Sequence, residues 1–147
     1  MTHSVATVDS LTAALDELVD RVPGAEFAVV LSPDGLLLGR SSTVADKPAE
    51  QISGVVSGLY ALGQAAARVC GGGVLRQVVT QMSRAFLFLA TTRSGAILTV
   101  RMGGDADVGD MAYEVALFAA RAERELPVFL EPARMVTGGN SGAHRGP

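Results

Sequence analysis

Residues 52–67 read ISGVVSGLYALGQAAA and contain no charged side chain. At helical spacing this stretch divides into three stripes. One is apolar (Ile52, Val55, Leu59, Leu62, Ala66 and Val69), one is polar (Ser53, Ser57, Gln64 and Arg68) and one consists of very small residues (Gly54, Gly58, Ala61 and Ala65). A surface helix with a single buried face has one apolar stripe and a charged remainder. The stretch therefore predicts a helix that is covered on more than one side.

The stripe of small residues predicts a close contact with another helix. Small side chains four residues apart let a second backbone approach closely, for steric reasons. A glycine costs about 1 kcal/mol relative to alanine inside a helix, so Gly54 and Gly58 indicate a packing requirement. We expect this helix to meet a second copy of itself or another protein; a helix buried wholly within one domain is the alternative. A transmembrane span needs about 20 apolar residues, whereas this run is shorter and contains serines and a glutamine.

The composition is that of one globular domain of ordinary size. The chain has 147 residues, of which 48% are hydrophobic, and a net charge of −3. These values exclude a disordered chain and do not favour wholesale binding to nucleic acid or to an acidic membrane. Cys70 is the single cysteine, so no disulfide can form within the chain. Without a secretion-signal pattern at the N-terminus, a reducing cytoplasm is the expected location.

The segment before the long helix predicts a helix followed by a β-hairpin. Asp9 or Ser10 is expected to cap the first helix, which ends at Pro23-Gly24. Residues 27–32 (FAVVLS) and 36–39 predict two strands. The Ser32-Pro33-Asp34-Gly35 sequence between them is a strong turn signal, because proline sets φ and glycine accepts the left-handed conformation.

The long helix itself is predicted to begin at Asp46 or Lys47 and to end at the glycine run 71–73. Three strands follow it, over residues 74–82, 85–92 and 96–102, and a last helix opens near Asp105 or Asp107 and is stopped by Pro127. The breaks between these strands are short, which favours an antiparallel meander. The sequence FLFLA at residues 86–90 places apolar side chains on both faces of the sheet, so helices must cover both faces.

The predicted fold is α+β, in the order α-β-β-α-β-β-β-α, with a single antiparallel five-stranded sheet and helices on both faces. We expect one domain over residues 9–130, with flexible ends at residues 1–8 and 136–147.

No combination of side chains predicts catalysis, a cofactor or a metal site. Cys70 lies at the C-terminal end of a helix, where the dipole does not favour a thiolate, and the only histidines, His3 and His144, lie in the expected flexible ends. The glycine run 71–73 leads from helix to strand, the reverse of a phosphate loop, and predicts a helix C-cap. Asp110 and Glu114 are four residues apart, but no histidine joins them.

Three other polar groups have ordinary structural explanations. Gly103-Gly104 precedes a helix N-terminus, but Asp105 and Asp107 already supply negative charge there, which predicts capping. Asp16, Glu17 and Asp20 form an acidic run that predicts a solvated helix face or a docking patch for a basic partner. Tyr113 is expected either to project to solvent or to seal a sheet edge.

An ordered series of short motifs resembles the bacterial branch of the roadblock (dynein light chain) family, especially the small proteins encoded in actinobacterial conservon operons. The motifs run from about Leu11 to Leu126 and are Val22-Pro23-Gly24, Ser32-Pro33-Asp34-Gly35-Leu36-Leu37, Ala49-Glu50-Gln51, Ser57-Gly58-Leu59, Gly71-Gly72-Gly73, Arg76-Gln77-Val78-Val79, Phe86-Leu87-Phe88, Asp107-Val108-Gly109 and Ala112-Tyr113-Glu114-Val115-Ala116-Leu117. Each motif is weakly specific alone, whereas the ordered set is quite specific.

The resemblance implies a homodimer in which the third strands pair edge to edge and the long helices pack across the two-fold axis. It also implies that the chain alone does not catalyse a reaction. Relatives bind small Ras-like GTPases as regulators or scaffolds, and conservon relatives accompany a sensor-kinase-like protein. Gln81 departs from the acidic residue expected in many relatives, which puts a partner contact at that strand end in doubt.

From these inferences we expect a non-catalytic homodimeric regulator of a small Ras-like GTPase in bacterial signalling, cytoplasmic and without direct membrane insertion, although a partner could recruit it to the membrane. The expected dimer contacts are Gly54, Gly58, Ala61, Ala65, Val74, Arg76, Val78 and Thr80. The expected partner contacts are Ser53, Ser57, Tyr60, Gln64 and Arg68, which are predicted to face away from the core. A small-molecule sensing domain of the profilin, PAS or GAF type is the alternative; its pocket would need aromatic side chains, and aromatics are only 5% of this chain.

Overall fold

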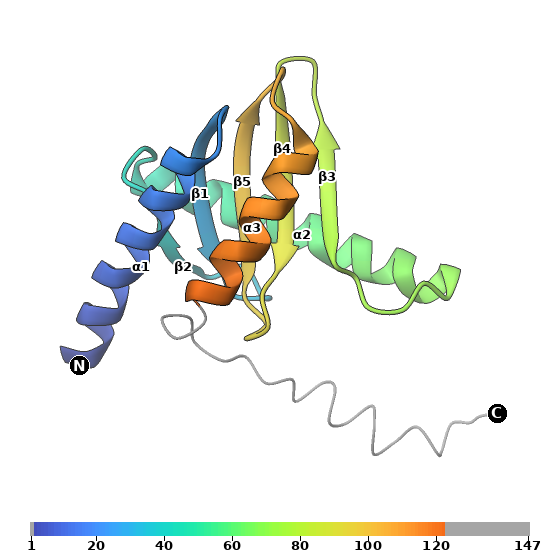
Figure 1. Ribbon diagram of the computed structural model, residues 1–147. Coiled ribbons are helices and arrows are strands. Elements are labelled where there is room, and N and C mark those ends of the chain that lie inside the picture. Colours follow the sequence, from blue (N-terminus) through green and yellow to red (C-terminus); the bar gives the residue numbers. More distant parts are fainter. Residues whose placement is uncertain (1, 123–147) are drawn as a thin grey trace.

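The computed structural model describes residues 2–122 and has a single antiparallel sheet between two layers of helices (Figure 1). The elements are α1 (Thr2–Arg21), β1 (Ala25–Leu31), β2 (Leu37–Arg40), α2 (Asp46–Cys70), β3 (Gln77–Gln81), β4 (Ala85–Thr91), β5 (Ile97–Gly103) and α3 (Val108–Ala122). The strand order is β2-β1-β5-β4-β3. Helices α1 and α3 cover one face and α2 crosses the other, which confirms the predicted fold class.

Two turns at one end of the sheet fix the strand register. In the β1–β2 turn, Gly35 has a φ of 96° and the Ser32 Oγ donates to Asp34, as the turn signal predicts. In the β4–β5 turn, Gly95 has a φ of 94° and its N–H donates to the Thr92 carbonyl at 3.0 Å. The β1–β2 and β4–β5 turns both adjoin the same row of residues, which is paired across β1, β5 and β4. The two turns therefore lie at the same end of the sheet, which we call the turn end.

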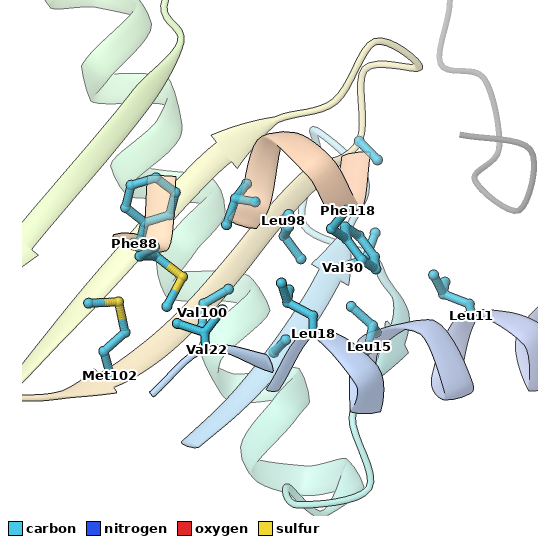
Figure 2. Packing of buried hydrophobic residues seen from close by; sticks show 14 residues of the cluster. Leu11, Leu15, Leu18, Val22, Val30, Phe88, Leu98, Val100, Met102 and Phe118 are labelled. Carbon is cyan, nitrogen blue, oxygen red and sulfur yellow. The ribbon is translucent and has the colours of Figure 1, made fainter. Parts of the chain in front are cut away.

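The sheet separates two apolar cores. The larger lies under α1 and α3 and contains Phe88, whose side chain is 1% exposed. Toward the turn end of this core, Phe118 of α3 packs beside Val30 and Leu98 (Figure 2). The smaller core lies under α2 and contains side chains of alternate parity on the same strands, such as Val29 and Leu89. This alternation is why the central strands are apolar on both faces.

Two predicted boundaries are wrong. The first helix begins at Thr2 rather than at Asp9 or Ser10, because residues 2–8 contain no glycine or proline that would stop it. Strand β3 begins at Gln77 rather than at Val74, because β4 turns away at Thr92 and leaves the preceding residues without a ladder partner. The predicted helix stripe at Leu126, its stop at Pro127 and the expected flexible end at 136–147 lie outside the described residues.

No helix within residues 2–122 is long and apolar enough to cross a membrane.

Gly24 is expected to be more sensitive to substitution than Gly71, although both have a left-handed backbone conformation. Its φ is 90°, and a Cβ there would lie 2.8 Å from the Cβ of Ala106, which has no freedom to move aside. Gly71 provides the matched control, since its φ of 64° is also left-handed but a Cβ would meet nothing within 4 Å. Gly71→Ala should therefore cost about 1–2 kcal/mol for the backbone conformation alone, and Gly24→Ala should cost distinctly more. Chemical denaturation of both variants measures the difference, and equal costs would contradict the predicted clash.

Candidate interaction surface on α2 and β3

Helix α2 has an inner face that packs on the sheet. Ala49, Ser53 and Val56 are fully buried there, and Ile52, Leu59 and Tyr60 pack against the smaller core. The helix ends at Cys70 and is capped by Gly71, whose left-handed φ of 64° lets its N–H donate to the carbonyl of Arg68, confirming the predicted C-cap.

The opposite side of α2 is also apolar but is uncovered within the described protomer. Val55, Leu62 and Val69 are 60%, 70% and 86% exposed. Together with Gly58 and Ala65 they recur at alternating intervals of three and four residues, the spacing of a helix–helix seam. We call these five residues the outer stripe. Past β3, the last turns of α2 project beyond the sheet (Figure 1).

The expected division of α2 into a core stripe and a partner-facing polar stripe is therefore only partly correct. Val55, Leu62 and Val69 were expected to share the apolar stripe of Ile52 and Leu59, but they face outward. Ser53 was expected to face away from the core, and that is wrong, because its side chain is fully buried. The Ser53 Oγ donates to the Ala49 carbonyl at 2.9 Å, so the hydroxyl is satisfied inside the helix and can face an apolar sheet.

The other predicted partner-facing residues differ in exposure. Tyr60 is half-buried against the smaller core, and this burial raises the pKa of its phenol. Ser57 Oγ donates to the Pro33 carbonyl at 3.3 Å and so ties α2 to the β1–β2 turn. Gln64 is exposed and its Nε2 donates to the Tyr60 Oη at 3.3 Å, while Arg68 is exposed. Of the five residues, only Gln64 and Arg68 lie fully on the surface.

Two glycines of α2, Gly54 and Gly58, have no close neighbour elsewhere in the described chain. A Cβ added at Gly54 or Gly58 would meet nothing within 4 Å. Gly63 differs, because a Cβ there would lie 2.9 Å from the Leu75 Cδ2 and 3.2 Å from the Val78 Cγ2. Packing within the described chain therefore explains why residue 63 is a glycine, but it does not explain why Gly54 and Gly58 are glycines.

Strand β3 forms one edge of the sheet and pairs only with β4 in the described part of the chain. Val78 packs toward α2, and Thr80 shares its parity. On the opposite face Val79 is 38% exposed. An uncovered edge strand with apolar side chains is a template for pairing with another strand. Val74 and Arg76 precede the strand, so they lie beside this edge rather than in it.

The polar groups singled out by the sequence have structural roles. Both Asp16 carboxylate oxygens accept hydrogen bonds at 2.7 Å from Ser42, one from its N–H and one from its Oγ, which fixes the connection into α2. Glu17 pairs with Arg21. Asp107 Oδ1 accepts the Asp110 N–H at 3.1 Å and caps α3 as expected. Tyr113 is 65% exposed and projects to solvent.

Nothing in the described part of the chain assembles a reactive centre. Cys70 is exposed at the end of α2, and no group of three or more histidine, cysteine, aspartate or glutamate side chains could hold a metal ion there. What the geometry does bring together is the outer stripe of α2 and the open edge of β3.

A single sheet between α2 on one side and α1 and α3 on the other defines the layered class to which roadblock and profilin structures belong. Residues 11–102 match the family model described as Roadblock/LC7 domain. The crystal structure of a Roadblock/LC7 domain from Streptomyces avermitilis is similar, with 35% sequence identity, a TM-score of 0.72 and coverage of 77% of this chain and 94% of that chain. The chain belongs to the Roadblock/LC7 family, as the sequence motifs indicated.

More distant structures share the fold alone. The gliding protein MglB from Thermus thermophilus is 20% identical, with a TM-score of 0.71 and coverage of 82% of this chain and 90% of that one. Profilin IB from Acanthamoeba castellanii is also 20% identical, with a TM-score of 0.53 and coverage of 75% and 94%. No curated protein sequence matches the chain.

Proposed function

We propose that this protein is a non-catalytic homodimeric regulator or scaffold that binds a small Ras-like GTPase in a bacterial signalling system. The observation that carries the proposal is the doubly apolar helix α2 beside the open edge of β3, in a chain of the Roadblock/LC7 family. The proposed location is the cytoplasm, with recruitment to the membrane only through a partner.

The dimer follows from the need to cover this surface. Symmetric pairing about a two-fold axis is the commonest way to cover one patch with a second copy of itself. Edge-to-edge pairing of two β3 strands would extend the sheet and place the two α2 helices side by side. The proposed contacts are Gly54, Gly58, Ala61 and Ala65 on α2, and Val78 and Thr80 on β3, with Val74 and Arg76 at the margin. Val55 and Leu62 join this proposed set, because both are exposed.

A solved structure of the relative MglB is of a tetrameric arrangement, so at least one protein with this fold self-associates.

The GTPase partner is inferred from the resemblance to bacterial roadblock proteins, whose relatives bind such GTPases and, in conservon operons, accompany a sensor-kinase-like protein. Gln64 and Arg68 are the proposed contact residues, since they are the exposed members of the predicted polar stripe. Ser57 and Tyr60 would contribute only at the rim of such a contact, and Ser53 is excluded by its burial.

Binding is tested by a pull-down with the immobilised protein against purified small Ras-like GTPases of the host genome. Each GTPase is loaded with GDP or with a non-hydrolysable GTP analogue. The proposal expects one GTPase to be retained, with a preference for one nucleotide state. Failure of every GTPase to bind in either state would contradict it, even if the protein is dimeric.

At a saturating concentration of this protein, where a weakened contact does not limit formation of the complex, Arg68→Ala is expected to leave any stimulation of GTP hydrolysis unchanged within about two-fold, in contrast to the 10³–10⁵-fold that an arginine finger supplies. Arg68 lies on a helix near its C-terminus, where a cation is favoured anyway, rather than on a projecting loop. Stimulation would instead come from ordering the switch loops of the GTPase. Single-turnover hydrolysis with both proteins is the measurement. A loss of about 10³-fold with binding intact would identify Arg68 as a finger.

A further inference from the structure

The two edges of the sheet differ in how well they are protected against pairing with another strand. Strand β2 is four residues long, carries Arg40 and pairs with β1 through an irregular register. A short strand, a charged side chain and a bulge are all features by which proteins block a sheet edge. Strand β3 has a regular register, and its sequence, QVVTQ, contains neither a charge nor a proline. Strand β3 is thus the edge that is open to a further strand.

The hydrogen bonds to β4 show which residues of β3 have free backbone groups. At the turn end of the sheet the Thr91 N–H donates to the Arg76 carbonyl. At the other end the Met82 N–H donates to the Ala85 carbonyl. Because hydrogen-bonded and non-hydrogen-bonded pairs alternate in an antiparallel ladder, the even-numbered residues direct their N–H and C=O groups to β4. The outward-directed groups therefore belong to the odd-numbered residues, Gln77, Val79 and Gln81.

A second copy can bond to all of these outward groups in one register only. A two-fold axis makes the two β3 strands antiparallel, and the free groups meet only where both opposed residues are odd-numbered. With the axis at Val79, Gln77 faces Gln81 of the partner subunit and Val79 faces its own copy. Since each such pair forms two N–H···O bonds, about six bonds result. An axis at Val78 or Thr80 opposes one outward residue to a residue outside β3, which leaves about four bonds.

The side chains of β3 also fit this register. The sequence QVVTQ is nearly a palindrome about Val79, so the axis opposes glutamine to glutamine and Val78 to Thr80, two β-branched side chains. A glutamine amide both donates and accepts, so two opposed glutamines can hydrogen-bond to each other. Cross-strand pairs of these kinds stabilise a sheet. Val79, which is 38% exposed in the protomer, would be covered by its own copy.

We propose that two copies of the chain pair through β3 in a single register, with the two-fold axis at Val79, and that Gln77 and Gln81 determine which chains can pair. This inference rests on the homodimer of the proposed function. It adds the residues that set the register, since the expected contacts on β3 were only the even-numbered Val78 and Thr80. These two remain in the interface, where they face each other on the side of the sheet that α2 covers.

Charges introduced at positions 77 and 81 test the register. In Gln77→Glu/Gln81→Lys each new carboxylate should face a new ammonium group of the partner subunit. The dissociation constant should then fall by roughly 2- to 30-fold, because two cross-strand ion pairs form. Gln77→Glu/Gln81→Glu is the matched variant, which opposes like charges and should raise the dissociation constant by a similar factor. Both side chains are exposed, so the protomer should fold normally. Analytical ultracentrifugation measures both constants.

Mixing two charged chains tests whether these residues determine the choice of partner. A Gln77→Lys/Gln81→Lys chain combined with the Gln77→Glu/Gln81→Glu chain should form heterodimers in preference to either homodimer. Native mass spectrometry separates the three species. A statistical mixture of them would contradict the assigned role of Gln77 and Gln81.

Cysteine cross-linking locates the axis directly. In a Cys70→Ser background, Val78→Cys and Thr80→Cys chains are oxidised separately and as an equimolar mixture. With the axis at Val79, positions 78 and 80 of the two copies form a non-hydrogen-bonded pair with Cα atoms about 4.5 Å apart. This separation lies within the range of about 4.4–6.8 Å that a disulfide spans. Only the mixture should therefore give a covalent dimer.

The outcomes separate this inference from the proposed function. A covalent dimer from Val78→Cys alone would place the axis at Val78, and one from Thr80→Cys alone would place it at Thr80; either result overturns the register. A dimeric wild type whose affinity is the same in both charge variants would overturn pairing through β3 and leave the homodimer standing. A monomeric wild type in light scattering would overturn the homodimer itself, and this inference with it.

Discussion

Leu62→Glu should convert the proposed dimer into a folded monomer. Leu62 is 70% exposed in the protomer, so the substitution leaves the protomer core intact. In the proposed dimer the side chain is buried against the second α2, and an unpaired buried carboxylate costs several kcal/mol. Since the two-fold axis places the change on both copies, the dissociation constant should rise by at least about 10²-fold, because each tenfold step needs only about 1.4 kcal/mol. Light scattering measures this as a fall from twice the 15.1 kDa chain mass to a single chain.

Three further variants test whether the effect is specific to the proposed contact between the two α2 helices. Leu36→Glu is the matched control, because Leu36 is 66% exposed but lies next to the β1–β2 turn; it should remain dimeric. Gly58→Glu should also yield a monomer or an aggregate. Gly58→Ala tests closeness of approach: in an isolated protomer it should stabilise α2 by about 1 kcal/mol, whereas against a second helix it should weaken the dimer. If the wild-type protein is a monomer at micromolar concentration, the proposal of a dimer is contradicted.

Phe88→Ala should be the most destabilising single truncation in the larger core. The ring is 1% exposed at the centre of β4 and belongs to the core cluster to which α1, α3 and β5 also contribute side chains (Figure 2). Removing a buried phenylalanine side chain costs about 3–5 kcal/mol in lost burial and residual cavity. This is a large part of the roughly 5–15 kcal/mol by which a domain is typically stable.

Tyr113→Ala provides the control for removing an aromatic ring without opening a cavity. Tyr113 is 65% exposed on α3, so its loss should change the free energy of unfolding by no more than about 0.5 kcal/mol. Urea unfolding of both variants at one protein concentration measures the contrast. Similar midpoints for the two variants would show that α3 and β4 do not pack as described.

Local backbone chemistry could be read from the sequence because it depends on few residues. The Ser32–Gly35 turn, the C-cap at Gly71 and the cap at Asp107 each follow from the conformational freedom or hydrogen bonding of one side chain or of glycine. The number of strands follows from the apolar runs and the short breaks between them, and the two-sided burial of the sheet follows from the doubly apolar β4.

The orientation of α2 could not be read in this way. In a helix with two apolar faces, the spacing of apolar residues does not determine which face packs on the sheet. The prediction from the sequence therefore grouped Val55 and Leu62 with Ile52 and Leu59. Ser53 then looked polar and outward, whereas its bond to the Ala49 carbonyl lets it face the sheet. Nor could the start of β3 be placed, since Val74 has strand propensity but β4 turns away at Thr92 before it can pair.

The interleaving of two faces on α2 has an evolutionary consequence. Residues that pack on the sheet (Ser53, Val56 and Tyr60) alternate along the chain with residues that do not (Val55, Gly58 and Leu62). Mutations at the second set can accumulate without a cost to folding. After gene duplication, two copies in one genome could thus diverge in whether they pair with themselves or with each other, while the domain beneath stays the same.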